Sequence, residues 1–325
     1  MRDRGEMSTF LVTGGCGFIG SHLCEALVAR GDCVRVVDDL STGAIENLPA
    51  GLELYRGSVA EPELVRSAME DVAGCFHLAA VASVERSTQD WFGSHRTNLS
   101  GTVAVFDSSR KMARSRPIPI VYASSAAVYG DCQELPLKED MPVRPRSAYG
   151  ADKYGCELHA RVAAEVYGVP TAGLRLFNVY GPRQDPASPY SGVISIFCDR
   201  IRRGLPLNVF GDGSQTRDFV FIEDVVRAFI AAMDQLHDGA NVFNVCTGQS
   251  TSVLELANLV GELCGSEPQI QFQPSRPGEI PHSLGDGRLL SRRLALSTSV
   301  TLRSGLMRTL SWMKKTETVQ GTCAE

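Results

Sequence analysis

Strand-like apolar runs alternate with helical patterns through the first half of this 325-residue chain. The predicted strands are short and rich in apolar residues: Phe10–Thr13, Cys33–Asp38, Gly74–Leu78, Ile118–Ala123 and Thr171–Arg175. The predicted helices lie between them: His22–Arg30, Glu61–Glu70, Arg96–Ala113 and Ala148–Tyr167. Strands joined by crossover helices pair in parallel. The pattern therefore predicts an α/β fold with a doubly wound parallel sheet over the first ~175 residues.

The sequence pattern changes after Asn178, where turn-rich segments alternate with the helical stretches Val193–Arg203 and Ile222–Asp234. We expect a smaller C-terminal domain that is interleaved with the first. The predicted division gives the first domain residues 7–176, with 219–245 returning to it, and the second domain residues 177–218 and 246–313. Residues 314–325 are polar, and we expect them to form a flexible tail.

Composition limits the partners and the compartment. A formal net charge of −5 gives no general attraction to nucleic acid or to an acidic membrane, so an anionic ligand needs local binding groups. The ten cysteines include no CxxC pair, so we expect reduced thiols and no metal site. The charged residues 1–7 precede an apolar run that is too short for a signal sequence or a membrane span. We expect a cytoplasmic protein.

Glycines at positions 14, 17 and 20 follow the first predicted strand and open the first helix. Glycines at a helix N-terminus let the backbone approach a pyrophosphate. The next strand ends at Asp38, where a carboxylate can accept the ribose hydroxyls of NAD and would repel the extra phosphate of NADP. The glycine spacing alone is a weak signal, because a glycine-rich turn with a loop-capping Asp38 would look the same. The strand–helix–strand context favours NAD.

Tyr149 and Lys153 lie four residues apart and therefore share one face of the predicted helix. The lysine ammonium can stabilise a tyrosine phenolate, which makes the pair a candidate base. Such pairs are commonly solvated surface residues. Here Ser124 and Ser125 end a predicted strand at the carboxyl edge of the sheet, where ligands of such folds bind and where a hydroxyl can contact a reacting alcohol.

An ordered series of motifs runs from about residue 8 to residue 313: GGCGFIG, VVDDLSTG, HLAA, TNLSGT, YASSAAVYG, YGADK, LFNVYGPRQDP, FGDGSQTRDF and RPGEI. The series resembles the extended short-chain dehydrogenase/reductase family, and within it the UDP-hexose 4-epimerases. The resemblance implies a Rossmann-like domain that binds NAD tightly and a smaller domain that binds a UDP-sugar.

The resemblance also implies a reaction. Tyr149 would take the proton from the sugar 4-hydroxyl while hydride passes from carbon 4 to NAD. The 4-keto sugar would then turn over and receive hydride on its other face. Lys153 would support Tyr149 and hold the nicotinamide ribose, and Ser125 would bond to O4, with Ser124 behind it.

The resemblance assigns further contacts by position. Asn98 and Phe177 would lie beside the cofactor, whereas Asn208 and Phe210 would surround the uracil. The expected cofactor contacts are Gly14, Gly17, Phe18, Ile19, Gly20, Asp38, Ser58, Val59, Leu78, Ala79, Ala80, Asn98, Tyr149, Lys153 and Phe177. The expected substrate contacts are Ser83, Ser124, Ser125, Asn178, Val193, Asn208, Phe210, Arg217, Arg276, Glu279 and Ser283. Two of these, Arg217 and Arg276, would bind the diphosphate, although either could form a surface salt bridge instead.

Some positions depart from the family pattern. Ser58 replaces an acid that contacts the adenine, and Ala82 replaces a lysine of some relatives, so we expect somewhat weaker cofactor binding. Ser283 stands where bulk limits N-acetylated sugars, so we expect UDP-N-acetylglucosamine and its galacto epimer to be accepted as well as UDP-glucose and UDP-galactose. The Leu294–Leu296 segment replaces a usual Gly-Trp, so packing near the C-terminus is expected to differ.

Other functions remain open. Related dehydratases and decarboxylases usually carry acids after the catalytic hydroxyl, where this chain has Ala126 and Ala127. A 4-ketoreductase that releases oxidised cofactor is a further alternative. From another class, a non-catalytic NAD sensor or scaffold would share the fold. The helices near 96–113 and 148–167 pair across a homodimer in relatives, and we expect the same here, although core packing explains the same apolar stripes.

Overall fold

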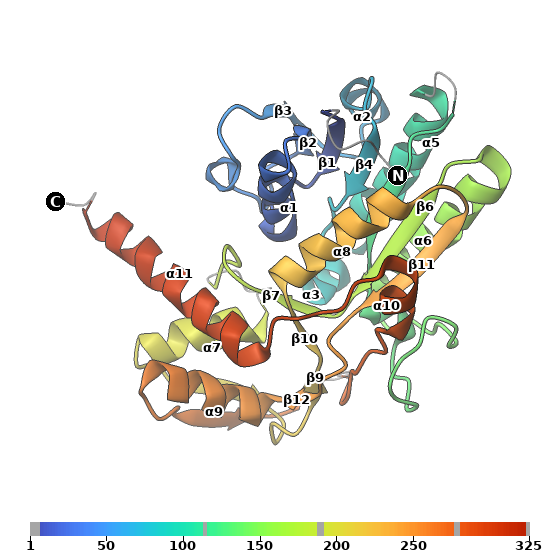
Figure 1. Ribbon diagram of the computed structural model, residues 1–325. Helices are drawn as coiled ribbons and strands as arrows, with labels where there is room; N and C mark the ends of the chain where they lie inside the picture. Colours follow the sequence, from blue (N-terminus) through green and yellow to red (C-terminus); the bar gives the residue numbers. More distant parts are fainter. Residues whose placement is uncertain (1–6, 113–115, 187–191, 276–279, 323–325) are drawn as a thin grey trace.

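A seven-stranded parallel sheet forms the centre of the computed structural model, which describes residues 7–112, 116–186, 192–275 and 280–322 (Figure 1). Its strands follow the order β3-β2-β1-β4-β5-β6-β11. Their bounds are β3 (Glu53–Arg56), β2 (Cys33–Asp38), β1 (Thr9–Thr13), β4 (Gly74–His77), β5 (Ile120–Ser125), β6 (Thr171–Leu176) and β11 (Ala240–Val245). The strand order reverses between β1 and β4. Such a switch point leaves a crevice at the carboxyl edge of the sheet.

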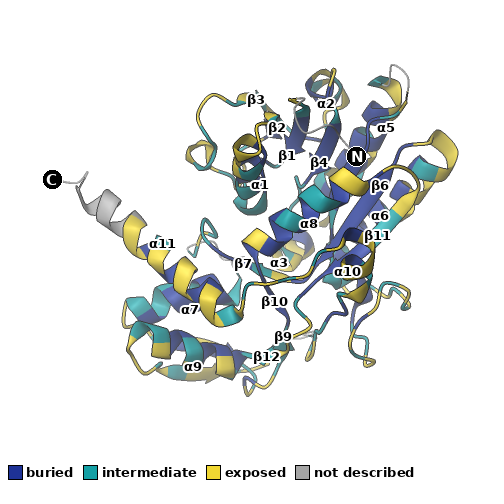
Figure 2. Cartoon of the chain, viewed as in Figure 1, coloured by how far each residue is buried: buried dark blue, intermediate teal, exposed yellow. Residues whose placement is uncertain are grey.

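Helices cover both faces of the sheet (Figure 1). One apolar cluster joins one face to α1 (Phe18–Ala29) and α8 (Ile222–Gln235). A second cluster joins the other face to α2 (Pro62–Ala68), α5 (Gly101–Met112) and α6 (Ala148–Tyr167). Neighbouring strand residues alternate between the clusters, because successive side chains of a strand point to opposite faces. The central strands β1, β4, β5 and β6 are therefore buried on both sides (Figure 2).

The remaining segments form a smaller unit below the sheet in Figure 1. Its strands pair two by two: β7 (Asn178–Tyr180) with β10 (Phe219–Phe221), β8 (Leu207–Phe210) with β13 (Ile270–Gln273), and β9 (Thr216–Arg217) with β12 (Thr251–Ser252). Its helices are α7 (Val193–Arg202), α9 (Val253–Cys264) and α11 (Leu302–Thr322), and α10 (Arg288–Leu294) packs beside β11. The division into domains proposed from the sequence remains a proposal.

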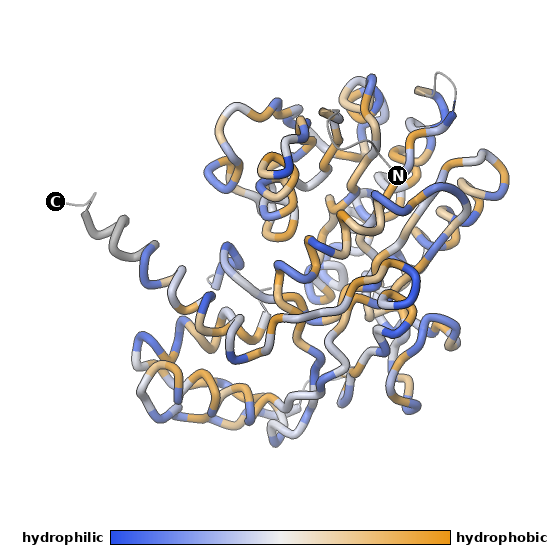
Figure 3. Tube along the Cα trace, in the orientation of Figure 1, coloured by the Kyte–Doolittle hydropathy of each residue, from blue (hydrophilic) through white to orange (hydrophobic). Residues whose placement is uncertain are grey.

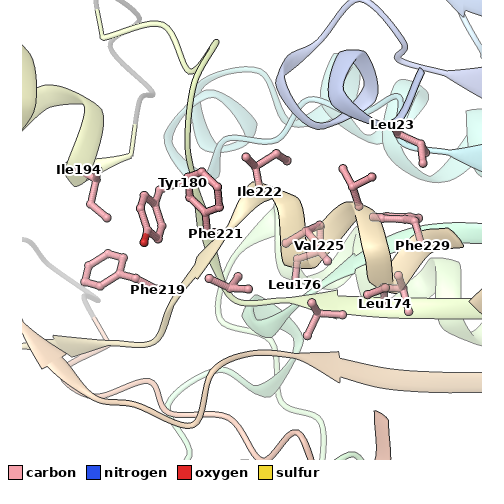
Figure 4. Close-up of a cluster of buried hydrophobic side chains, with 14 of the residues drawn as sticks. Leu23, Leu174, Leu176, Tyr180, Ile194, Phe219, Phe221, Ile222, Val225 and Phe229 are labelled. Carbon is pink, nitrogen blue, oxygen red and sulfur yellow. The ribbon is translucent and has the colours of Figure 1, made fainter. Parts of the chain in front are cut away.

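One apolar core runs through both units. Figure 4 shows Leu174, Val225 and Phe229 at the sheet, followed by Ile222, Phe221 and Tyr180, and then Ile194 and Phe219 in the smaller unit. The Tyr180 ring lies 5.4 Å from that of Phe221 and 6.5 Å from that of Phe219, measured between centroids. Apolar residues also gather along the inner faces of the helices (Figure 3). The two units therefore share buried surface.

Most predicted elements agree closely with the structure. The bounds of β2 and α6 are those predicted, and α1 begins at Phe18, four residues before the predicted start. The predicted helix 96–113 is divided into a π-helical turn, η2 (Arg96–Ser100), and α5, while Ala113 lies outside the described residues. The sequence analysis missed the short helices α3 (Val84–Gln89) and α4 (Trp91–His95), whose turns carry few apolar residues.

The end of the chain differs from the expectation of a frayed tail after Trp312. The backbone of α11 continues to Thr322. Leu306, Leu310 and Met313 are buried at helical spacing and anchor the preceding turns. Residues such as Lys, Glu and Gln, which form helices well, then extend the helix.

The structure also describes the state of the cysteines and the character of the helices. The cysteines in the described part of the chain are all free thiols. Across the same residues, no helix combines the length and the apolar character that crossing a membrane requires.

Candidate active site

The glycine loop lies at the switch point, between the end of β1 and the start of α1. Gly14 has a φ of +71°, and its amide donates to the Val37 carbonyl at 2.8 Å. A Cβ on Gly20 would lie 2.1 Å from the Gly14 carbonyl oxygen, so only glycine permits this close turn. Gly17 precedes α1 and provides no side-chain cap for its first amides. The loop and helix start, including Phe18 and Ile19, therefore suit an anion such as a pyrophosphate.

Asp38 ends β2 beside this loop and is 7% exposed. Its Oδ2 accepts from the Cys16 amide at 2.9 Å, and its Oδ1 accepts from the Leu40 amide at 2.8 Å. Desolvation raises the pKa of the Asp38 carboxyl above its usual range, and these two hydrogen bonds oppose the shift. The carboxylate therefore shapes the glycine loop, and each oxygen keeps acceptor capacity for ribose hydroxyls.

Asn98 supports the opposite wall of the crevice. Its Oδ1 accepts from the Val81 amide at 2.7 Å, and its Nδ2 donates to the Val81 carbonyl at 3.3 Å. The Leu78 and Ala79 amides bond to the Thr13 hydroxyl at 3.2 and 3.3 Å. The segment that includes Ala80 is thus fixed between β4 and η2. Asn98 is fully buried, so the structure gives it a supporting position, and its predicted contact with the cofactor remains a prediction.

Three other predicted cofactor residues, Ser58, Val59 and Phe177, pack against or bond to nearby backbone. The Ser58 hydroxyl accepts from the Ala60 amide at 3.2 Å in the turn after β3, and the neighbouring Val59 is buried against Gly101. Phe177 is also buried, and it packs so closely that a Cβ on Gly285 would lie 2.7 Å from its ring.

Ser125, Tyr149 and Lys153 gather where β5 ends and α6 begins. The Lys153 Nζ donates to the Ala123 carbonyl at 2.9 Å and lies 5.8 Å from the centroid of the Tyr149 ring. The Ser147 hydroxyl caps α6 by accepting from the Gly150 amide at 3.0 Å. The start of α6 lies close to the turn η3 (Ala126–Tyr129), because a Cβ on Gly150 would lie 2.7 Å from the Ala127 carbonyl oxygen.

Ser124 and Ser125 have different surroundings. Ser125 is partly exposed, and its hydroxyl accepts from the Ala127 amide at 3.1 Å. Ser124 is 1% exposed, and its hydroxyl donates to Glu157 at 2.6 Å. Successive strand residues point to opposite faces, so Ser124 lies behind Ser125. The structure therefore gives no support to Ser124 as a direct substrate contact, although it was included as one in the predicted set.

On the other side of the crevice, the structure brings Asn178, Arg217 and Ser283 near one another. The Asn178 amide donates to the Asp218 carbonyl at 3.0 Å, and the Ser283 amide donates to the Thr216 carbonyl at 3.1 Å. The Arg217 Nη1 donates to the Thr216 carbonyl at 2.9 Å and to the Pro281 carbonyl at 3.3 Å. Arg276 and Glu279 lie outside the described residues.

Asp218 connects these segments, and the sequence analysis missed it. Its buried carboxylate accepts from the Thr247 amide at 2.8 Å, the Thr247 hydroxyl at 2.6 Å, the Gly248 amide at 2.8 Å and the Gly285 amide at 3.3 Å. Desolvation raises the pKa of Asp218, and the same hydrogen bonds oppose the shift. Asp218 follows Arg217 in the TRDF motif, which was the available signal.

Beyond Arg217, Phe210 borders a groove of about 750 Å³. The groove is lined by Phe210, Gly211, Asp212, Ser214, Gln215, Phe272, Gln273, Pro274, Ser275 and Pro281. Aromatic rings and polar side chains together suit a planar, polar ring such as a nucleobase. Asn208 lies two residues before Phe210 and is exposed, with its Oδ1 accepting from Gln273 at 3.3 Å.

The remaining predicted substrate residues begin helices. Ser83 caps α3, where its hydroxyl accepts from the Arg86 amide at 3.1 Å. Val193 is the first residue of α7 and is partly buried.

His77 is a second residue that the sequence analysis missed. Its buried ring lies between the Thr13 hydroxyl, 2.7 Å from Nδ1, and the Thr102 hydroxyl, 2.9 Å from Nε2. Thr102 donates its proton to the Asn98 carbonyl, so it accepts from Nε2–H, and Thr13 donates to Nδ1. A neutral ring thus joins β1, β4 and α5 beneath the crevice. Burial and, second, the charge of Lys153 lower the pKa of His77 to about 3.

We expect His77 to make the folded state less stable in acid. Between about pH 6.5 and pH 3 the unfolded chain binds a proton at His77 that the folded protein does not, so the free energy of unfolding falls as the pH falls. One such proton contributes up to about 1.4 kcal/mol per pH unit. Urea unfolding of wild type and His77→Gln at several pH values checks this: the wild type should lose stability more steeply with acid, whereas parallel pH dependences would contradict the assignment.

The chain is similar to known proteins along most of its length. A family model described as NAD dependent epimerase/dehydratase family matches residues 10–246. UDP-glucose 4-epimerase of Mycolicibacterium smegmatis is 36% identical over 310 residues, which cover 94% of this chain and 98% of that protein. UDP-glucuronic acid decarboxylase 1 of Arabidopsis thaliana is 33% identical over 311 residues, which cover 93% of this chain and 68% of that protein.

A solved structure extends the similarity to three dimensions. The UDP-glucose 4-epimerase of Thermotoga maritima, determined with UDP-glucose, matches this fold with a TM-score of 0.91 and 36% identity. The match covers 95% of this chain and 99% of that one. The Rossmann-like sheet, the glycine loop and Asp38 fit NAD, and the chain belongs to the NAD dependent epimerase/dehydratase family, with NAD as its cofactor.

Proposed function

We propose that this protein is a UDP-hexose 4-epimerase that acts through a transient 4-keto sugar. The observation that carries the proposal is the grouping of Ser125, Tyr149 and Lys153 at the carboxyl edge of the sheet, opposite Arg217 and the Phe210 groove. When bound there, NAD would supply reversible hydride transfer at carbon 4 of the sugar. The glycine loop and Asp38 would hold that cofactor through its pyrophosphate and ribose.

Each residue of the trio has a chemical task. Tyr149 removes the proton from the sugar 4-hydroxyl and later returns it. The Lys153 ammonium, held by the Ala123 carbonyl beside the Tyr149 ring, stabilises the phenolate. The Ser125 oxygen accepts from the Ala127 amide, so its own proton is available for the sugar O4. Together, the three groups control the transfer of the 4-hydroxyl proton while carbon 4 of the sugar is oxidised and then reduced.

The nucleotide would extend across the smaller unit. Arg217 would bind the diphosphate, because a guanidinium matches the geometry of phosphate oxygens. The uracil would enter the groove bordered by Phe210, with Asn208 at its edge. These contacts would anchor UDP while the sugar turns within the site.

Two alanines favour epimerisation over the other reactions of the family. Ser125 is followed by Ala126 and Ala127, where related dehydratases and decarboxylases usually place acids. Without such groups, the 4-keto sugar meets no side chain at these positions that could promote elimination. Return of the hydride is then the favoured outcome.

Incubation with UDP-glucose or UDP-galactose tests this function. The wild type should interconvert the pair without added reductant, as followed by chromatographic separation of the products. Tyr149→Phe should lower kcat by about 10²–10⁴-fold because it lacks the exchangeable proton. Its bound NAD, quantified after denaturation, should match the wild type. Full activity of Tyr149→Phe would contradict the mechanism, and release of carbon dioxide from UDP-glucuronic acid would indicate a decarboxylase instead.

We extend the proposal to N-acetylated sugars through Ser283. A small residue leaves room for an acetamido group, so UDP-N-acetylglucosamine should also be a substrate. Ser283→Tyr should lower kcat/KM for this sugar by at least about tenfold, because the added ring fills the space, and should change that for UDP-glucose far less. Equal rejection of UDP-N-acetylglucosamine by both proteins would refute the role of Ser283.

We also propose a homodimer formed through α5 and α6. Leu158, Val162 and Val166 form an exposed apolar stripe on α6, and Val103 is exposed on neighbouring α5. A self-complementary apolar face of this kind suits a two-fold interface.

Light scattering checks the dimer. The wild type should have about twice the chain mass of 35.1 kDa, and Val162→Glu should reduce it to the mass of one chain, because a charge cannot be buried there without a partner. Met307→Glu, on the exposed side of α11, is the matched control and should stay dimeric. A monomeric wild type would rule out the proposal.

A further inference from the structure

A buried network of polar side chains lies directly behind the trio. Arg175 forms two hydrogen bonds with Glu157, from Nε to Oε1 at 2.9 Å and from Nη2 to Oε2 at 2.7 Å. The Ser124 hydroxyl donates to the same Oε1 at 2.6 Å. Both side chains of the ion pair are about 5% exposed (5% for Arg175 and 6% for Glu157). A bidentate pair of this kind fixes the orientation of both groups.

The network places α6 relative to β5. Glu157 follows Tyr149 and Lys153 at intervals of four residues, so the three side chains lie along one stripe of α6. Lys153 bonds to the carbonyl of Ala123, and Glu157 bonds to the hydroxyl of Ser124. Two consecutive strand residues therefore hold the helix, immediately before Ser125. A rotation or slide of α6 would break both bonds.

The network extends far beyond these two elements. Arg175 lies on β6, where its Cα is paired with that of Ser124, and its Nη1 donates to the Tyr129 hydroxyl at 2.8 Å and to the Glu139 carbonyl at 3.1 Å. Tyr129 in turn donates to Asn244 on β11 at 2.7 Å. Three neighbouring strands and η3 thus fix the Glu157 carboxylate from several sides.

An apolar contact could also hold α6 against the sheet, but it would restrict the orientation of the helix less than hydrogen bonds do. Replacing a buried ion pair by apolar residues of similar size is often neutral or stabilising, so stability alone gives little reason for Glu157 and Arg175. Hydrogen bonds are directional, and a mispositioned reacting group can reduce a rate about 100-fold per ångström. The Glu157–Arg175 pair is therefore better suited to fixing the position of α6 than to adding stability.

We propose that Glu157 is a positioning residue that sets the register of Tyr149 and Lys153 against Ser125 through its bonds to Ser124 and Arg175. The inference rests on the proposed function, and specifically on the trio as the reacting groups. Glu157 itself does not contact the substrate.

Steady-state kinetics of the NAD-loaded full chain test this role. Ser124→Ala removes one bond without changing a charge and should lower kcat by about tenfold, and Glu157→Gln should lower it by about 100-fold. KM for UDP-glucose and the bound NAD should stay within about twofold of the wild type. The double variant should lose little more than Glu157→Gln, because Ser124 acts through Glu157.

A buried carboxylate elsewhere, Asp224, provides the matched control. Asp224 on α8 bonds to Arg227 and to the amides of Ser299 and Val300, on the face of the sheet opposite α6. Asp224→Asn should lower the Tm as Glu157→Gln does while leaving kcat near that of the wild type. Assays below both Tm values then separate stability from position.

The outcomes distinguish the two proposals. A kcat of Ser124→Ala and Glu157→Gln no lower than that of Asp224→Asn would overturn the positioning role, as would a loss confined to KM or NAD content. If Glu157→Gln does not fold, Ser124→Ala still decides. If the wild type does not epimerise, the epimerase proposal fails, and the same kcat comparison on the UDP-sugar reaction that it does catalyse decides the positioning role separately.

Discussion

The parallel register of β1, β4, β5 and β6 determines where the groups at the carboxyl edge of these strands lie. Thr13 is paired with His77 across β1 and β4, and Ser124 is paired with Arg175 across β5 and β6. Both pairs belong to the buried hydrogen-bond networks. A shift of one residue in either pairing would turn these side chains to the wrong face. The carboxyl ends of the strands consequently present the glycine loop, the Asn98 wall and Ser125 along one edge.

The smaller unit is attached to this edge through shared core and buried polar groups. Tyr180 packs between aromatic residues, and its hydroxyl donates to the Leu302 carbonyl at 3.3 Å. Asp218 draws the loops at Thr247 and Gly285 toward Arg217. Because these contacts are buried, the distance between the trio and the Phe210 groove is set by the fold rather than by the substrate. A fixed distance of this kind suits a ligand in which a diphosphate joins a nucleobase to a sugar.

Much of the fold could be predicted from periodicity, because the long elements bury one face or both. The bounds of α6 agreed with the prediction since its apolar spacing continues from Ala148 to Tyr167. The pairs β7–β10 and β9–β12 could not be found in this way, because strands of two or three residues carry no measurable alternation.

The candidate site was only partly predictable. Residue spacing, strand position and the resemblance together identified Ser125, Tyr149 and Lys153, which the structure brings together. Asp218 and Glu157 were missed because acids in a sequence are usually exposed. His77 stands in the HLAA motif, but the sequence alone does not show that its ring is buried between Thr13 and Thr102. Ser124 was expected behind Ser125 and was also included among the substrate contacts, and in the structure its hydroxyl donates to Glu157. Only the hydrogen-bond partners of a polar side chain show whether that side chain supports the fold or is available to a ligand.

The hydrogen-bond partners of a polar side chain also bear on which reaction the site can catalyse. The decarboxylase relative shows that this fold supports more than one outcome for a related sugar. Elimination of water from a keto sugar requires a base for the proton and an acid for the leaving group. The Glu157 carboxylate approaches β5 behind Ser125, but both of its oxygens are bonded to Arg175, and its side chain is 6% exposed. A carboxylate held in this way cannot exchange protons with a substrate. With alanines at the following two positions, Ser125 and the Tyr149–Lys153 pair are the groups at the end of β5 on which the proposed mechanism relies.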